Sequence, residues 1–600
     1  MNPRVMTILQ EAVGAFRAGR FADALAASEA ALDAAPGHVE ALHLKAMALG
    51  RLGRTDEAAR VFDETAARHP QRHAVLGNKG NALRAAGRAE EARAAYEAAV
   101  AANPRFAPGW AGLGAVLRDA ENYEGAQDAF RRALETSPKD AGVMNNLGVV
   151  VNKLGRREEA VELFSAALAL RPDMVSALVN RGAAYRDGGL LGKALEDHQK
   201  AVARAPSNAE AHYQRANTLR QAGKLMEAEA AYAAALALAP AREDIHSDLA
   251  RMLWEMGESG RFLDYLDRVN ATAPQAALLA LKSQFALLAG RLGAAETAAR
   301  RAVEADAQSA AAHRVAGSVH RHQGAHAAAV GAFERALACA PEDWDARHEL
   351  AEALLAHGEA ARAADMLDAD APQAHLQKHI ALKALAMRLS GDAGYRRYYD
   401  YDRFTRKMTI ETPPDFPNLA AFNEALVDAI RPLHATKAQP IDQTLYGGTQ
   451  SFGRLWDEPH PVIQALKDAL LKAAAAYAAQ LPDDPAHPFL AQKSADLECA
   501  GAWSVMLSSG GGHVDHIHPA GWISASYYVR VPEEVCFGGE KAGFLRLGAS
   551  GVRGVDLEAE RWFRPEEGAV VFFPSYMWHG VESFSAKTPR VTAPFDLKPR

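Results

Sequence analysis

The apolar positions in the first two thirds of the chain recur at helical spacing, as pairs of stripes separated by a glycine. Between residues 144 and 167, intervals of three and four residues predict two helices, with stripes at Met144, Leu147, Val150 and Val151 and at Ala160, Leu163, Phe164 and Ala167. Gly155 lies between the stripes, where the first helix must end and the chain must turn. Pro172 follows the second stripe and cannot continue it. Each such unit is therefore predicted to be a helix–turn–helix hairpin.

The hairpin recurs with a fixed period. Prolines stand 34 residues apart, at Pro36, Pro70, Pro104, Pro138, Pro172, Pro206, Pro240 and Pro274. The turn glycines keep the same register, at Gly19, Gly53, Gly87, Gly155, Gly189, Gly223 and Gly257. Glu121 occupies the slot of that series that lacks glycine, and after a slip of one residue the period resumes at Gly290, Gly324 and Gly358. We therefore expect a repeat array of about eleven units over residues 3–375.

A helical pair of 34 residues resembles the tetratricopeptide repeat. The resemblance rests on the Leu113-Gly114 and Leu147-Gly148 pairs, the terminal prolines and the second-helix alanines at Ala58, Ala92, Ala126, Ala160, Ala194 and Ala228. It implies an all-α superhelix with a concave groove. The array is accordingly expected to bind a protein partner or a polypeptide substrate.

An amide residue recurs eight residues after several of the prolines, at a position that the family tends to turn into the groove. The candidates for peptide binding are Asn78, Asn146, Asn180 and Gln214. An amide can both donate to and accept from a peptide backbone, and the pattern resembles the asparagine ladder of peptide-binding repeat superhelices. The alternative is that asparagine is simply common at this consensus position.

The period disappears after about residue 380. Residues 376–435 are predicted to form a connecting helical region, and residues 436–600 a domain with short strands separated by glycine-rich turns. Helices are expected at 420–430 and 462–481, and strands at 502–507, 523–531, 544–547, 569–573 and 590–595. This pattern predicts a double-stranded β-helix, or jelly roll, with flanking helices. The predicted fold class is thus a multidomain chain, with an all-α superhelix followed by a jelly roll.

Histidines concentrate at two places in the predicted jelly roll. His516 and His518 are two residues apart, so they share a face of an extended strand, and His579 comes from a distant strand. Three neighbouring ligands leave one side of an octahedral ion open, as oxygen and a co-substrate require at non-haem Fe(II). His513 and Asp515 form a competing pair on the opposite face, unless a β-bulge intervenes. The residues alone therefore leave two ligand sets open: His516, His518 and His579, or His513, Asp515 and His579.

The runs HVDHIHPAGWISASYYV from His513 and FPSYMWHG from Phe573 resemble the 2-oxoglutarate/Fe(II) oxygenase family often found behind tetratricopeptide repeats. The resemblance covers about residues 440–600. In that family the His-x-His-Pro element stands where other oxygenases carry His-x-Asp, which favours His516, His518 and His579 as the ligands. The resemblance implies Fe(II), 2-oxoglutarate and O2, with hydroxylation as the default outcome.

Arg590 lies eleven residues after His579. In the oxygenases that the chain resembles, a basic residue at about this distance binds the distal carboxylate of 2-oxoglutarate, and a guanidinium can hold a carboxylate bidentately. Tyr528 or Tyr527 is expected to assist, and because the two side chains face opposite ways, only one can do so. Ser526 is a weaker candidate for the same site.

Composition and charge limit the partners. With 67 basic and 74 acidic residues the net charge is −7, so no nucleic-acid binding is expected. Three cysteines without framework spacing, no signal-like start and no long apolar run predict a cytoplasmic chain without a membrane span. Two rival classes remain open: a binding scaffold with a degenerate oxygenase fold, and a three-histidine dioxygenase independent of 2-oxoglutarate. The substrate and the oligomeric state do not follow from the sequence.

Overall fold

The computed structural model describes residues 3–434, 441, 444–451, 455–537 and 541–600. The chain divides into two compact units, Met1–Ala222 and Gly223–Arg600, so the division falls within the predicted repeat array. The predicted boundary between residues 435 and 436 lies outside the described residues. The predicted fold class, a tetratricopeptide superhelix followed by a jelly roll, is confirmed.

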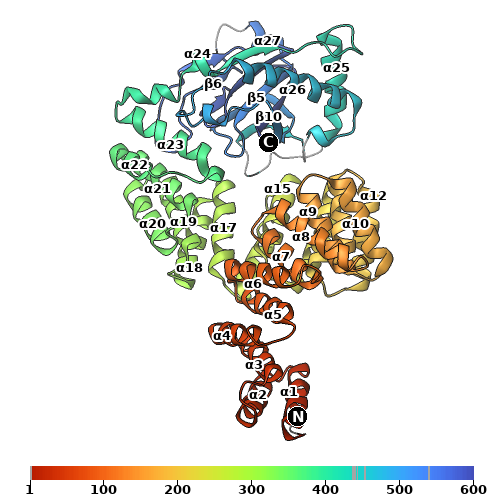
Figure 1. Cartoon of the computed structure of the whole chain (residues 1–600). Coiled ribbons are helices and arrows are strands. Elements are labelled where there is room, and N and C mark those ends of the chain that lie inside the picture. The colour runs from red at the N-terminus through yellow and green to blue at the C-terminus, as the bar shows by residue number, and fades with distance from the viewer. Residues whose placement is uncertain (1–2, 435–440, 442–443, 452–454, 538–540) are drawn as a thin grey trace. The chain divides into compact units, whose positions relative to one another are not determined.

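The first unit consists of helices arranged as successive hairpins (Figure 1). They are α1 (Pro3–Arg17), α2 (Phe21–Ala34), α3 (Val39–Arg51), α4 (Thr55–Ala66), α5 (Arg72–Ala85), α6 (Ala89–Ala102), α7 (Ala107–Asp119), α8 (Tyr123–Thr136), α9 (Ala141–Lys153), α10 (Arg157–Leu170), α11 (Val175–Asp187), α12 (Leu191–Arg204) and α13 (Ala209–Gln221).

A small residue on the first helix of a hairpin faces a ring on the second. A Cβ atom on Gly148 would lie 2.6 Å from the ring of Phe164, and one on Gly114 would lie 2.8 Å from the ring of Phe130. Both phenylalanines are buried. The glycine therefore lets the two helices approach until the aromatic ring fills the space between them.

The turn glycines are required by the backbone. Gly155 has φ of 79°, and the other predicted turn glycines lie in the same left-handed region. Glu121, in the slot without glycine, also adopts a positive φ of 58°, and it is the one described residue other than glycine that does so. The repeat geometry thus imposes the left-handed turn even where a side chain disfavours it.

The second unit continues with helical hairpins and ends in a β-domain covered by further helices (Figure 1). Its helices are α14 (Leu225–Leu238), α15 (Glu243–Glu255), α16 (Asp264–Thr272), α17 (Ala276–Leu288), α18 (Leu292–Ala305), α19 (Ala310–His322), α20 (His326–Cys339), α21 (Trp344–His357), α22 (Ala360–Met366), α23 (Leu376–Leu389), α24 (Tyr401–Phe404), α25 (Leu419–Ile430), α26 (Pro461–Gln480) and α27 (Glu533–Phe537). The expected helices at 420–430 and 462–481 correspond to α25 and α26.

The strands of the β-domain are β1 (Arg406–Thr409), β2 (Leu445–Gln450), β3 (Leu497–Ala502), β4 (Val505–His516), β5 (Ile523–Arg530), β6 (Leu545–Leu547), β7 (Arg561–Phe563), β8 (Ala569–Pro574), β9 (His579–Val581) and β10 (Arg590–Pro599). The expected strand at 502–507 is wrong in its extent. The chain leaves the ladder at residues 503–504, where the Ser504 amide donates to Ser451 Oγ, and β4 then runs through the glycines as far as His516.

Strand β4 lies between β10 and β9 in the sheet of the jelly roll. Its first residues pair with β10, Leu507 opposite Arg590, and its last residue, His516, pairs with His579 of β9. The ten strands form one antiparallel sheet with the order β1-β8-β5-β10-β4-β9-β6-β7, and β2 and β3 pair with β4 and β10 beside that path. Strand β1, which lies in the predicted connecting region, extends the sheet beyond β8.

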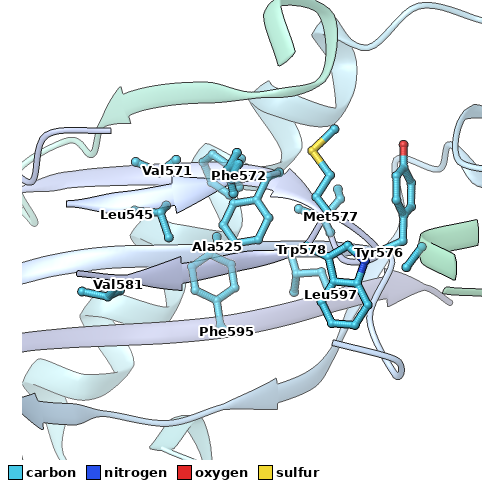
Figure 2. Close-up of a cluster of buried hydrophobic side chains, with 14 of the residues drawn as sticks. Ala525, Leu545, Val571, Phe572, Tyr576, Met577, Trp578, Val581, Phe595 and Leu597 are labelled. Atoms are coloured by element: carbon cyan, nitrogen blue, oxygen red, sulfur yellow. The ribbon is translucent and has the colours of Figure 1, made fainter. Parts of the chain in front are cut away.

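Alternation along β8, β5 and β10 separates the face of the sheet that the helices cover from the interior. Phe572 stacks on Tyr477 of α26 with ring centroids 5.0 Å apart, and Tyr527 donates to Asn423 of α25. Phe572 and Phe595, on strands β8 and β10, have centroids 6.0 Å apart (Figure 2). The neighbouring residues along each strand are therefore directed toward the interior of the barrel.

The tyrosine-rich segment after α23 contacts the barrel beside His579. Tyr399 Oη accepts from the backbone N–H of Trp578 at 3.2 Å, and Tyr576 Oη donates to the carbonyl of Tyr398 at 2.7 Å. Figure 2 shows Tyr576, Met577 and Trp578 together in the buried cluster. The connecting region thus fixes the segment that carries His579.

Among the helices of the described residues, none combines the length and the apolar character that a bilayer crossing requires.

We predict that Glu121→Gly stabilises the first unit. Glycine relieves the left-handed strain at a position where φ is 58°. Part of that gain is offset by the greater freedom of glycine in the unfolded chain, so about 0.5–1 kcal/mol should remain. Hydrogen exchange of the α7 and α8 amides measures the effect as slower opening.

The matched control is Glu124→Gly, three residues further along in the first turn of α8. Here glycine replaces a helical residue, so the opening free energy should fall by about 1 kcal/mol. Faster exchange in Glu121→Gly would contradict the assignment of strain to this turn.

Candidate metal centre

Three histidine rings meet inside the β-domain. His516 ends β4, His518 follows two residues later and His579 begins β9. Their potential ligand atoms all lie within 4.8 Å of one another, and the Nε2 atoms of His516 and His518 are 3.1 Å apart. Two nitrogens bound at about 2.1 Å and at right angles to one ion would be about 3.0 Å apart. In the part of the chain that the structure describes, this is the one group of three or more such residues close enough to share an ion.

The second nitrogen of each ring has an acceptor of its own. Nδ1 of His516 lies 2.8 Å from the carbonyl of Val514, and Nδ1 of His579 lies 2.9 Å from that of Met577. Nδ1 of His518 lies 2.6 Å from a carboxylate oxygen of Asp596. Each acceptor assigns the proton to Nδ1, so in the neutral rings the Nε2 atoms carry lone pairs that point at one another. Such an arrangement is suited to a cation.

Burial keeps the rings in the form that can bind a metal. Loss of solvation lowers the pKa of His516 and of His579 well below the usual value of 6.5, and the neighbouring histidines add to the effect. These two imidazoles are therefore neutral at physiological pH, which is the state that coordinates a metal ion.

A β-bulge decides which of the competing residues face the interior. His513 pairs with Val581 and His516 with His579, so three steps along β4 match two along β9. As a result His513 and His516 both line the central cavity. Asp515 instead pairs with Arg546, with Oδ2 to Nη2 at 2.7 Å. The structure therefore does not bring His513, Asp515 and His579 together as one set, and the assignment of ligands stays a prediction.

The candidates for co-substrate binding lie along the same cavity. Arg590 and Ser526 line it, and Tyr528 packs below the Arg590 guanidinium, whose carbon is 5.1 Å from the ring centroid. Arg590 is only 2% exposed; its Nη1 donates to the carbonyl of Gly543, while Nε has no partner. The hydroxyl of Tyr528 also lacks a partner. Tyr527 faces the other way, toward α25.

Sequence reasoning missed Asp596. It lies on β10 at an even spacing from Arg590, and alternate residues of a strand share a face. Arg590, Thr592 and Pro594 all line the cavity, so counting by two from the arginine would have led to this carboxylate.

Trp503 also lines the cavity, whereas Trp522 is buried and donates to the carbonyl of Phe489.

The predicted peptide-binding amides all belong to the first unit, and several of them connect neighbouring repeats. Asn78 Nδ2 lies 2.9 Å from Nε2 of His43, and Asn180 donates to Asn145 Oδ1 at 2.9 Å. Gln214 accepts from Arg186 at 2.6 Å. For Asn146, which is half-buried, the described residues show no such bond. A peptide-binding role for these residues stays a prediction.

Comparison with known proteins finds families that match the helical repeats and the β-domain. A family described as "Putative 2OG-Fe(II) oxygenase" matches residues 501–596. Tetratricopeptide repeat families match residues 9–73, 43–108, 78–141, 117–182, 199–230 and 286–343. Among curated proteins, none matches the chain.

Several solved structures are similar to part of this chain. YrrB, "a TPR protein with an unusual peptide-binding site", is 23% identical, with 31% of this chain and 95% of that chain covered and a TM-score of 0.27. The type IV pilus biogenesis factor PilW is 22% identical, with 34% and 94% covered and a TM-score of 0.32. A repeat protein of Parabacteroides merdae is 20% identical, with 39% and 93% covered and a TM-score of 0.32.

The chain therefore carries tetratricopeptide repeats in its N-terminal region. Its C-terminal domain is of the 2OG-Fe(II) oxygenase type at residues 501–596.

We predict that acidification destabilises the metal-free barrel through its buried histidines. Burial, with a smaller contribution from the charge of Arg590, lowers the pKa of His513 to about 3. The unfolded chain takes up this proton below about pH 6.5 and the folded chain does not. The free energy of unfolding therefore reaches its full value above pH 6.5. It falls toward pH 3 by about 1.4 kcal/mol per pH unit for each such histidine.

In EDTA, the free energy of unfolding of His513→Asn should fall between pH 8 and pH 5 by about 2 kcal/mol less than that of the wild type. Hydrogen exchange of the β4 and β10 amides at the two pH values measures this. His357→Asn, at a half-exposed histidine of α21, is the control and should leave the pH dependence unchanged. An unaltered pH dependence in His513→Asn would contradict the prediction.

Proposed function

We propose that the C-terminal domain is an Fe(II)- and 2-oxoglutarate-dependent dioxygenase that hydroxylates a peptide or protein side chain recruited by the repeat array. The observation that carries the proposal is the convergence of three Nε2 atoms whose Nδ1 atoms already have acceptors. His516, His518 and His579 would hold the iron and leave one side of it open.

The cavity also fits the co-substrate. Arg590 is a buried cation with no carboxylate partner among the described residues, and its Nε and the hydroxyl of Tyr528 are both unsatisfied. A buried charge without a partner is costly. A dicarboxylate bound to the histidine-held iron at one end and to Arg590 at the other would satisfy both atoms, which supports 2-oxoglutarate as the ligand. Ser526 lines the same cavity and offers a further hydroxyl.

Bound iron, 2-oxoglutarate and oxygen would supply the oxidising chemistry for hydroxylation, with succinate and carbon dioxide as co-products. The protein's own residues provide geometry. Arg590 and Tyr528 orient the dicarboxylate, while the apolar walls at Leu507, Leu545 and Phe573 exclude water from the cavity. Trp503 lies beside His518, with ring centroids 5.4 Å apart, and shields one side of that ligand.

The repeat array supports a polypeptide as the substrate. Tetratricopeptide repeats typically bind peptides or proteins, and their stacked helices form an extended concave surface. The last hairpins share a unit with the barrel, and the Gly554 backbone lies against His326 of α20 and Ala356 of α21. Recruitment by the array would raise the effective concentration of the substrate near the cavity.

A second candidate function is a three-histidine dioxygenase that needs no 2-oxoglutarate. The donor set favours it, because the three converging ligands include no carboxylate. The two functions differ in their need for Arg590.

We predict that Arg590→Ala weakens 2-oxoglutarate binding by about 100-fold, since a charge-assisted bidentate pair contributes up to about 3 kcal/mol. Anaerobic titration with Mn(II) in place of iron measures binding, and oxygen uptake with succinate formation measures turnover. His579→Ala should abolish both metal binding and turnover.

Arg564→Ala, at an exposed position of the same domain, is the matched control and should behave as the wild type. Iron-dependent turnover that persists in Arg590→Ala and ignores 2-oxoglutarate would favour the three-histidine dioxygenase. Absence of any 2-oxoglutarate-dependent oxygen uptake by the wild type would favour the scaffold.

We predict that Asn146→Ala impairs substrate recruitment. The loss of an amide that bonds a peptide backbone should raise KM about 10-fold and leave kcat unchanged, corresponding to about 1.4 kcal/mol. Mass spectrometry of lysate proteins for +16 Da products identifies the substrate. The KM and kcat of the wild type, Asn146→Ala and the control variant are then measured on that substrate. Asn152→Ala, on another face of α9, is the control. An unchanged KM in Asn146→Ala would remove this residue from the recruiting surface.

A further inference from the structure

Asp596 is a buried carboxylate with an unusual set of partners. Its side chain is 9% exposed on β10. One oxygen lies 2.6 Å from Nδ1 of His518 and 2.6 Å from Oγ of Ser524, which is itself 2.9 Å from Oγ of Ser575. The carboxylate is therefore held in one orientation behind a single ring of the histidine cluster.

Among the described residues no lysine or arginine pairs with Asp596, and its one ionic partner is His518. Burying an anion without a compensating cation costs several kcal/mol. Asp515, a carboxylate of the same domain, does have a compensating cation, because it forms an ion pair with Arg546. Within the described part of the chain, the hydrogen bond that links Asp596 to a possible cation site is the one to His518, so a cation bound by that ring would balance its charge.

The other two rings have neutral acceptors. His516 and His579 rely on the backbone carbonyls of Val514 and Met577. Three neutral imidazoles would leave both charges of a divalent ion uncompensated, whereas two histidines and one carboxylate would cancel one of them. A carboxylate directly behind a ligating histidine orients the ring and raises its basicity.

We infer that Asp596 is a positioning residue that supplies the missing negative charge to the metal centre through His518. This inference rests on the proposed function, because it requires that the histidines bind a divalent ion. Strand β10 then carries two opposite charges on its interior face: Arg590 for the co-substrate, and Asp596, six residues later, for the metal.

The test is Asp596→Asn in the full chain, which keeps the shape and the hydrogen-bonding capacity but removes the charge. With Co(II) as the probe at pH 8, titration followed by visible absorption gives the affinity and the ligand field of the site. We expect Co(II) to bind 10- to 100-fold more weakly than in the wild type, with an altered absorption spectrum. Asp468→Asn, at an exposed carboxylate of α26, is the control and should bind Co(II) as the wild type does.

Stability in EDTA separates this role from a structural one. Removing an uncompensated buried charge should leave the thermal unfolding of the metal-free protein unchanged or raise its midpoint. If Asp596 only braced the fold, the midpoint would fall and the Co(II) affinity would not change, which would overturn the inference. If Asp596→Asn fails to fold, Ser524→Ala, which removes one anchor of the carboxylate, should weaken Co(II) binding several-fold, and an unchanged affinity there overturns the inference too.

The outcomes also distinguish this inference from the proposed function. A wild-type protein that binds no Co(II) overturns both. A wild type that binds Co(II), together with an Asp596→Asn variant of equal affinity, overturns the inference alone.

Discussion

Three imidazole nitrogens that face one point constrain the rest of the β-domain. Each ring is fixed from behind, by a backbone carbonyl for His516 and His579 and by a carboxylate for His518. Because the Nδ1–H groups donate to these acceptors, the Nε2 lone pairs oppose one another across 3.1 Å between His516 and His518. The barrel holds this electrostatically unfavourable arrangement through packing and hydrogen bonds, and a cation would turn it into an attractive one.

The course of strand β4 makes that arrangement possible. The strand pairs with β10 near its start and with β9 at its end, so His516 comes to lie opposite His579. A bulge before His516 turns Asp515 toward Arg546 and leaves His513 facing the cavity. One extra residue in a strand therefore selects which side chains surround the proposed metal and which form a structural ion pair.

The site is also connected to the helical part of the second unit. Tyr399 and Tyr398 bond to the backbone or side chains of residues 576–578, directly before His579. Arg388 of α23 donates to the carbonyl of Glu558 at 3.1 Å. These contacts make the position of the His579 ring depend on the segment that joins the repeats to the barrel.

The sequence by itself determined the repeats, because a hairpin is defined within 34 residues by apolar spacing and by turn positions that need a positive φ. Even the exception at Glu121 follows that geometry. It also located His516, His518, His579 and Arg590 as candidates, since their spacing and strand ends are local features. Only the tertiary structure decided the inward register of β4 and the pairing of Asp596 with His518. Those depend on a bulge and on a contact between residues 78 positions apart, which no local pattern encodes.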